Sequence, residues 1–129
     1  MKMKVCDYCS KGILQFKLIS YKVSVYGATV IPVGKVPANV CSYCNEEFFD
    51  LISINDANKK ALKILHFKYM NCPDTISGTI AGWMRIKMKI SRDSLTIDTE
   101  SLKKCERDNL YVPVEIATTL LDMTTKYLL

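Results

Sequence analysis

Apolar and polar residues partly alternate in the first part of the chain, which is the pattern of β-strands. Residues 13–19 (ILQFKLI) and 21–26 (YKVSVY) are rich in β-branched and aromatic side chains. Gly27 can turn the chain into a third apolar run at residues 29–31. We expect this run to end before Cys41, at residues that break strands: Pro32, Gly34 and Pro37. The pattern therefore predicts a twisted β-hairpin.

A helix is expected within residues 45–70 (NEEFFDLISINDANKKALKILHFKYM), after the second CxxC. Asn55 or Ser53 suits the N-cap of this helix. A buried stripe is expected at Ala57, Leu62, Leu65 and Tyr69, and a solvated side at Lys59, Lys60, Lys63 and Lys68. The only histidine, His66, falls in the last turn, where a capping or packing role is more common than metal ligation.

Pro73 ends that helix, and Asp74 or Thr75 suits the start of the next one. Helical spacing then predicts a buried side at Ile76, Ile80, Trp83 or Met84, and Met88, and a basic stripe at Arg85, Lys89 and Arg92. A last helix is expected from Pro113, with a buried side at Ile116, Leu120, Met123 and Tyr127. The elements together predict an α+β protein.

The composition is that of a folded domain, because 49% of the 129 residues are apolar and 24% are charged. No apolar run approaches the roughly 20 residues that a bilayer crossing needs. The N-terminal MKMKVCDYC has lysines but no apolar stretch behind them, so we expect no secretory signal. These features predict a cytoplasmic protein without a membrane partner, in which thiols stay reduced.

Charge is distributed unevenly along the chain. Residues 1–70 carry ten basic and five acidic groups, whereas residues 71–129 carry eight of each. A basic chain favours nucleic-acid binding, but here the excess lies in the first half. The charge balance therefore gives the second half little general attraction for a phosphate backbone.

Two CxxC pairs stand on either side of the predicted hairpin, at Cys6 and Cys9 and at Cys41 and Cys44. Each CxxC places two sulfurs at one tight turn, and two facing turns supply the tetrahedral S₄ site that structural zinc prefers. A unit of this size buries little core, and a structural metal commonly offsets that deficit. The spacing thus predicts a zinc ribbon with Zn²⁺ held by four thiolates.

Other uses of the cysteines fit less well. A redox dithiol needs a single CxxC ahead of a helix in a βαβ unit, and a catalytic zinc needs a coordination position open to water. Cys72 and Cys105 lie outside the pairs and are expected to pack as small apolar residues.

The order of these features resembles the YgiT-type zinc-finger family, which includes antitoxins of the MqsA type. The resemblance rests on an early CxxC, a hairpin interval, and CSYCNEEFFD (41–50) followed by a helix, and it covers roughly residues 1–69. In that family the zinc domain precedes a helix-turn-helix domain of the Xre type. The resemblance therefore implies two domains here, at residues 1–70 and 71–129.

The second half is similar to an Xre-type domain in part. ISRDSL (90–95) matches its opening stretch, SLKKCERDN (101–109) its recognition helix, and Pro113 the proline before its last helix. About four or five residues are missing after Leu95, so the helix that braces the recognition helix is expected to be short or absent. Lys104 stands where the family has an arginine, and a lysine does not reproduce the bidentate grip of arginine on guanine.

The family resemblance implies an antitoxin that is also a transcriptional regulator. Its zinc half would silence a toxin of the mRNA-cleaving ribonuclease kind, through a strand edge around residues 21–30. Its helical half would form a homodimer and bind double-stranded DNA at its own promoter. The residues expected to contact DNA are Arg85, Lys89, Arg92, Lys103 and Lys104.

Two other classes of function remain open. The first is a zinc-stabilised protein-interaction module without sequence-specific DNA binding, which the negative charge of Asp98, Glu100 and Glu106 favours. The second, an enzyme, is not expected, because the sequence offers no paired carboxylates, no phosphate-binding loop and no nucleophile with a histidine base.

Overall fold

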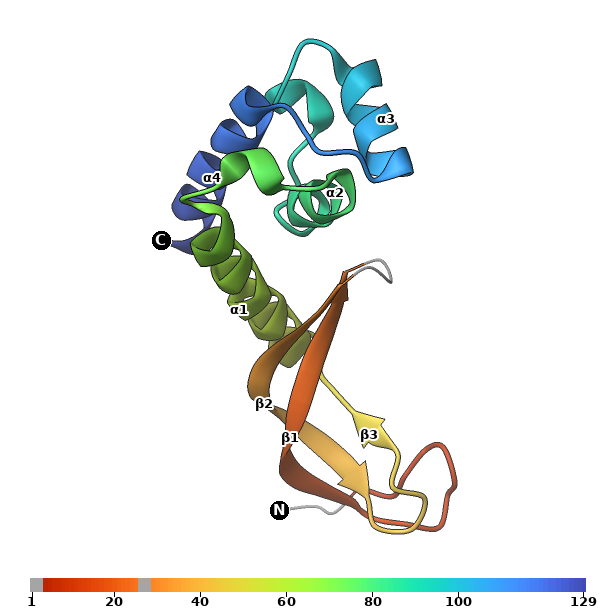
Figure 1. Ribbon diagram of the computed structural model, residues 1–129. Helices are drawn as coiled ribbons and strands as arrows, with labels where there is room; N and C mark the ends of the chain where they lie inside the picture. Colours follow the sequence, from red (N-terminus) through yellow and green to blue (C-terminus); the bar gives the residue numbers. More distant parts are fainter. Residues whose placement is uncertain (1–3, 26–28) are drawn as a thin grey trace.

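The computed structural model describes residues 4–25 and 29–129 (Figure 1). A small antiparallel sheet has the strand order β1-β2-β3, and four α-helices follow it in the described chain. Helices α2, α3 and α4 gather at one end of the molecule, and α1 leads from them to the sheet (Figure 1). The structure confirms the predicted α+β class.

Strands β1 (Leu14–Val25) and β2 (Thr29–Cys41) form one long hairpin. The prediction that Gly27 makes the turn falls outside the described residues, as does the end of the predicted 21–26 strand. The short strand β3 (Glu47–Phe48) pairs with β2 only at Asn39 and Val40. Among the described residues, most of β2 therefore has a neighbouring strand on one side only.

The prediction that β2 ends before Cys41 is wrong, because the strand runs through Pro32, Gly34 and Pro37. Proline is tolerated in a strand whose second edge is unpaired, since the missing N–H then costs no ladder hydrogen bond. Gly34 has a φ of 87° and lies at a register shift opposite Tyr21 and Lys22. A bulge with glycine at positive φ bends the strand without ending it.

The two faces of the hairpin differ in burial. One face contributes five side chains to the core: Val23, Val25, Ile31, Val33 and Val36. On the opposite face, Phe16 and Leu18 are 71% and 55% exposed, although they are large and apolar. Cross-strand partners share a face, so Pro37, opposite Leu18, extends this uncovered surface.

Helix α1 (Leu51–Tyr69) begins earlier than the sequence predicts. Its N-cap is Asp50, whose carboxylate accepts a hydrogen bond from the backbone N–H of Ser53 at 2.7 Å, so neither Ser53 nor Asn55 caps it. The predicted buried stripe is confirmed, and Ala61 joins it. This stripe packs against the hairpin at one end of α1 and against α4 at the other.

The helical half consists of α2 (Gly78–Lys87), α3 (Thr99–Asp108) and α4 (Val114–Leu128), with 3₁₀ turns at Pro73–Thr75 and Arg92–Ser94. Ser77 caps α2, in place of the expected Asp74 or Thr75, which lie in the first 3₁₀ turn. The apolar side predicted for α2 is buried as expected. Only the second 3₁₀ turn stands between α2 and α3 among the described elements.

The buried side of α4 is displaced from the predicted one. Ile116 and Leu120 are buried as expected, but Tyr127 is exposed, and Leu121 and Thr124 are buried in its place. Thr124 satisfies its hydroxyl by donating to the backbone carbonyl of Leu120 at 2.8 Å.

One apolar core joins residues of the hairpin, α1, α2, α3 and α4. The boundary predicted after residue 70 falls at the end of α1, and the core extends across it. The domain division itself stays a prediction. None of the helices in the described chain has the length and apolar content that a membrane crossing requires.

Gly78 lets α3 lie close against α2. A Cβ on Gly78 would collide with the backbone carbonyl of Cys105, which cannot move aside as a flexible side chain would. We expect Gly78→Ala to lower the free energy of unfolding by about 1–3 kcal/mol, the usual cost of overpacking. Urea unfolding measures this, with Gly34→Ala as a control that meets open space but strains a positive φ. Unchanged stability of Gly78→Ala would contradict the packing.

Candidate metal centre

The two CxxC turns lie side by side at the end of the hairpin and have the same backbone form. Cys6 and Cys41 accept hydrogen bonds through their carbonyls from the N–H groups of Ser10 and Asn45, at 2.9 and 3.1 Å. Ser10 and Asn45 both take positive φ, of 60° and 61°. Each turn therefore closes on the residue after its second cysteine, in a conformation that glycine or asparagine adopts at low cost.

The four sulfurs converge as the sequence predicts. The Sγ atoms of Cys6, Cys9, Cys41 and Cys44 all lie within 4.8 Å of one another. Cys6 Sγ lies 3.9 Å from Cys44 Sγ, and Cys9 Sγ lies 3.5 Å from Cys41 Sγ. All of these thiols are free rather than joined in disulfides.

These separations fit a tetrahedral metal ion. A metal–sulfur bond of about 2.3 Å places neighbouring sulfurs of a tetrahedron roughly 3.8 Å apart, close to the observed values. Cys6 and Cys41 are buried, whereas Cys9 and Cys44 are half-buried. A set of four sulfurs leaves no ligand position for substrate, so the centre suits a structural role.

Backbone N–H groups stabilise thiolates in the cluster. Hydrogen bonds from the backbone of Lys11 and Gly12 lower the pKa of Cys9 to about 6. Burial raises the pKa of Cys41, but the N–H groups of Tyr43 and Cys44, at 3.3 and 3.4 Å from its Sγ, lower it by more. Both groups are thus prepared to act as anionic ligands.

Cys44 differs from its neighbours. The backbone at Glu46 lowers the pKa of the Cys44 thiol, but burial and the sulfurs of Cys41, Cys9 and Cys6 together raise it to about 12. Neighbouring sulfurs disfavour a further negative charge because like charges repel. A divalent cation among them reverses this and deprotonates a coordinating thiol.

Gly12 makes the close approach of the two turns possible. A Cβ there would overlap Cys41 Sγ and crowd the backbone N of Tyr43. We expect Gly12→Ala to push a ligand out of place and to weaken metal binding about tenfold or more. Competition with a chromogenic chelator measures this, and Gly34→Ala, in β2 and away from the sulfurs, serves as the control. Equal metal affinity in Gly12→Ala would contradict the geometry.

The remaining candidates for metal ligation lie elsewhere. His66 Nε2 is 2.8 Å from Thr125 Oγ1 and joins α1 to α4, which agrees with the predicted packing role. Cys72 and Cys105 are only half-buried, and their thiols donate to the backbone carbonyls of Lys68 and Tyr111, at 3.4 and 3.9 Å. Neither belongs to the sulfur cluster.

The residues predicted to contact DNA do not share one exposed surface. Arg85 is buried, and its guanidinium donates to both carboxylate oxygens of Glu106 at 3.0 Å and to the carbonyl of Ile90 at 3.2 Å. Arg92 donates to Glu106 as well, at 2.9 and 3.1 Å. The structure gives these arginines a partner within the protein, in place of the open basic stripe that the sequence predicts.

Three lysines of the predicted DNA contacts are exposed. Lys89 follows α2 with a φ of 57°, and Lys104 is exposed on α3 beside Lys103, close enough for its charge to lower the pKa of Asp108. Lys103 pairs with Glu100 one turn away, at 3.1 Å. Asp98 caps the N-terminus of α3 by accepting from the N–H of Ser101, which places a carboxylate at the start of this helix.

Some residues shape the sites without being ligands, and sequence patterns do not reveal them. Ser10, Gly12 and Asn45 are ordinary residue types, and their roles arise from backbone conformation and close contact. Glu106 appeared only as a negative charge, because its partners stand 14 and 21 residues away in the chain.

Comparisons with protein-family models, with curated protein sequences and with solved structures yield no match for this chain.

Proposed function

We propose that the chain is a zinc-stabilised, antitoxin-type protein that binds a small partner protein through its sheet. The observation that carries the proposal is the uncovered apolar face of the hairpin, where Phe16 and Leu18 lie exposed near the sulfur cluster. Apolar surface of this kind, at the edge of a sheet, favours a protein partner. The motif order of the YgiT-type family supports a toxin as that partner.

The edge of the sheet supplies the second element of this binding surface. β1 is an edge strand in the order β1-β2-β3. Its Leu14 N–H donates to the carbonyl of Lys4, and beyond Leu14 its outer backbone groups have no backbone partner among the described residues, so a strand of another chain could pair there. Backbone pairing contributes affinity, and the side chains of Phe16 and Leu18 contribute specificity. The partner would therefore add to the sheet and cover its apolar face.

Zinc holds this surface in shape. Near the cysteines the hairpin buries Ala38, Val40 and Cys41, which lie outside the apolar core, whereas its other end packs into that core. The sulfur cluster joins the start of β1 to the end of β2. In a reduced environment, four thiolates at tetrahedral spacing are best suited to bind zinc.

Co-expression with the product of the adjacent reading frame tests the proposal. We expect a complex that survives gel filtration and that relieves growth arrest caused by the partner. Phe16→Asp with Leu18→Asp should abolish both effects, whereas Ile97→Asp, at a fully exposed apolar residue of the helical half, should leave them unchanged. Relief of arrest by the sheet variant, or no complex with the wild-type chain, would refute the proposal.

DNA binding is the second candidate function, and the order α2, α3, α4 with exposed Lys103 and Lys104 on α3 favours it. Arg85 and Arg92 are paired with Glu106 and add little attraction for phosphates. A gel shift with DNA from upstream of the reading frame tests this. Lys103→Ala with Lys104→Ala should weaken the shift, relative to Lys17→Ala in the sheet. Equal binding to random duplex would leave the protein-interaction module without sequence-specific DNA binding.

A further inference from the structure

The hydrogen bonds at the start of β1 show which of its backbone groups point outward. Leu14 donates its N–H to the carbonyl of Lys4 at 2.8 Å, on the side of β1 that faces away from β2. The carbonyl of Ile13 instead accepts from the N–H of Ser42 at 3.0 Å, on the side of β2. Successive residues of an antiparallel strand point their backbone groups to opposite edges. Every second residue after Leu14 therefore points its backbone groups outward.

The outward groups beyond Leu14 are those of Phe16, Leu18 and Ser20. Each of these residues offers one N–H donor and one carbonyl acceptor. Phe16 and Leu18 also carry the exposed apolar side chains of the outer sheet face. The same stretch of β1 thus presents edge backbone groups and uncovered apolar side chains, which is the combination on which a further strand forms.

The chain already pairs a short segment with the start of this edge. Val5 forms an antiparallel bridge with Ile13, and the N–H of Cys6 donates to the carbonyl of Gly12 at 2.9 Å. Among the described residues this pairing reaches no further along β1 than Leu14. The edge is therefore open to strand pairing at its start, and a longer strand can continue along it.

The other face of the same edge carries positive charge. Lys17 lies between Phe16 and Leu18, so its side chain points to the opposite face of the sheet, where it is exposed. None of the ion pairs found among the described residues involves Lys17. A strand that pairs with this edge would meet apolar side chains on one face and a lysine on the other.

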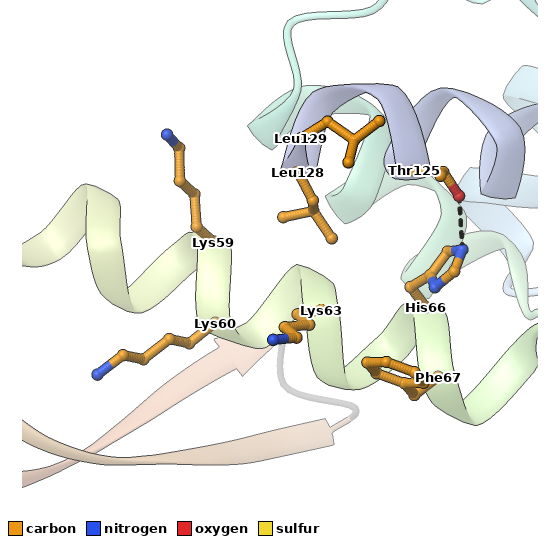
Figure 2. Close-up of a pocket in the computed structure, with 8 residues that line it drawn as sticks. All are labelled: Lys59, Lys60, Lys63, His66, Phe67, Thr125, Leu128 and Leu129. Carbon is orange, nitrogen blue, oxygen red and sulfur yellow. Dashed lines mark hydrogen bonds between the residues drawn. The ribbon is translucent and has the colours of Figure 1, made fainter.

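The hollow between α1 and the end of α4 is a less specific surface. Figure 2 shows Lys59 and Lys60 pointing away from each other, and His66 Nε2 lies 2.8 Å from Thr125 Oγ1. Lys59 Nζ lies 5.7 Å from the centre of the Tyr127 ring. These side chains do not converge on one ligand, whereas the edge of β1 presents its groups at the regular spacing of a strand.

We infer that the partner docks through a β-strand in which apolar residues alternate with acidic ones, and that this strand pairs with Phe16, Leu18 and Ser20. Its apolar side chains lie beside Phe16 and Leu18, and its carboxylates lie beside Lys17 on the other face. Cross-strand apolar pairs and pairs of opposite charge both stabilise a sheet. The inference rests on the proposed binding of a protein partner, and it specifies the chemistry of the segment that binds.

Hydrogen exchange of backbone amides tests the inference by NMR. The probe is the full, metal-loaded chain, free and in complex with the co-expressed product of the adjacent reading frame. In the free chain we expect fast exchange at Phe16, Leu18 and Ser20, and slow exchange at Lys17 and Ile19, whose groups face β2. In the complex, the fast amides should slow by about a hundredfold or more, because they then belong to a ladder.

Substitutions at Ser20 isolate the contribution of the backbone. Ser20→Pro removes one outward N–H, whereas Ser20→Ala removes the hydroxyl and keeps the N–H. Proline is tolerated on an edge strand where its missing N–H does not belong to the existing ladder. We expect Ser20→Pro to weaken the complex about tenfold and Ser20→Ala to leave it unchanged. Slow exchange at Lys17 and Ile19 in free Ser20→Pro shows that the hairpin is intact.

A charge reversal isolates the acidic part of the partner strand. Lys17→Glu should weaken the complex about fivefold or more, because like charges directly opposite each other destabilise a sheet. Lys126→Glu is the matched control, because Lys126 is an exposed lysine of α4.

A complex in which Phe16, Leu18 and Ser20 still exchange fast would overturn the inference. The partner would then bind the apolar face alone, and the proposed function would stand. Equal affinity of Ser20→Pro and Ser20→Ala would also overturn the strand pairing, and equal affinity of Lys17→Glu and Lys126→Glu would overturn its acidic part. Failure of the wild-type chain to form a complex would refute the inference and the proposed function together.

Discussion

Replacing Cys41 with serine is expected to abolish stoichiometric zinc binding and to unfold the end of the sheet that carries the CxxC turns. Cys41 is wholly buried and is the last residue of β2. Its sulfur accepts hydrogen bonds from two backbone N–H groups. Structural zinc contributes an apparent 10–16 kcal/mol in small domains, which is comparable to the entire stability of an ordinary domain, about 5–15 kcal/mol. The loss of stability in Cys41→Ser should therefore exceed the loss caused by any single change in packing.

Amide NMR spectra and elemental analysis measure this result. Signals from β1 and β2 near the cysteines should collapse toward random-coil positions, while those of α2, α3 and α4 stay dispersed, because these helices have their own buried residues. Cys72→Ser is the matched control, since that thiol lies outside the cluster. A Cys41→Ser chain that keeps a fully dispersed spectrum without metal would contradict the role of the centre.

Replacing Glu106 with glutamine is expected to lower the free energy of unfolding by about 3 kcal/mol or more. The carboxylate accepts hydrogen bonds from both Arg85 and Arg92, and the side chains of Arg85 and Glu106 are each only 11% exposed. Without the negative charge, the buried guanidinium of Arg85 lacks its counter-ion, which costs far more than the loss of a surface pair. Urea unfolding followed by circular dichroism measures the change.

The same ion pairs predict a dependence on pH. Burial raises the pKa of Glu106, but hydrogen bonds and charge from Arg85 and Arg92 outweigh it and hold the pKa below its usual value. A lowered pKa in the folded state contributes stability above the ordinary glutamate pKa, and this contribution disappears as the pH falls through the folded-state value. The stabilities of wild type and Glu106→Gln should therefore converge in acid.

Glu100→Gln is the control for both measurements, because Glu100 is 82% exposed and its ion pair among the described residues is the surface pair with Lys103 on α3. It should change the stability little at any pH. If Glu106→Gln were as mild as Glu100→Gln at neutral pH, the two arginines would not depend on Glu106 for their placement.

Local patterns predicted the parts of this molecule that depend on neighbours in sequence. The stripe of α1 from Ala57 to Tyr69 follows from the helical period alone, and the sulfur cluster follows from two CxxC turns on either side of a hairpin. The helical stripe depends only on residues close in sequence, and the sulfur cluster needs in addition only that the hairpin brings its two ends together. They are confirmed in the structure.

The features that the sequence patterns did not predict depend on contacts between residues far apart in the chain. Pro32 and Pro37 remain within β2 because its second edge is open, and the sequence does not reveal which strand edges are paired. Arg85 belongs to a basic stripe by its position in the sequence, but in the fold it is paired with Glu106 of α3 and buried. Tyr127 has the spacing of the α4 stripe but lies beyond the residues that α4 buries.

The arginine pairs bear on how the helical half would meet DNA. Only a 3₁₀ turn separates α2 from α3, and Glu106 joins this turn to both helices through Arg92 and Arg85. The pairs hold α3 to α2 and to the 3₁₀ turn between them. The arginines thus stabilise the fold instead of adding to the positive surface.

X-ray absorption at the zinc edge, combined with elemental analysis of purified and reduced protein, tests the metal centre most directly. We expect one zinc ion per chain, held by the four clustered cysteine sulfurs at about 2.3 Å. Protein that contains no stoichiometric metal, or whose zinc has nitrogen or oxygen ligands in place of one of the four sulfurs, would contradict it.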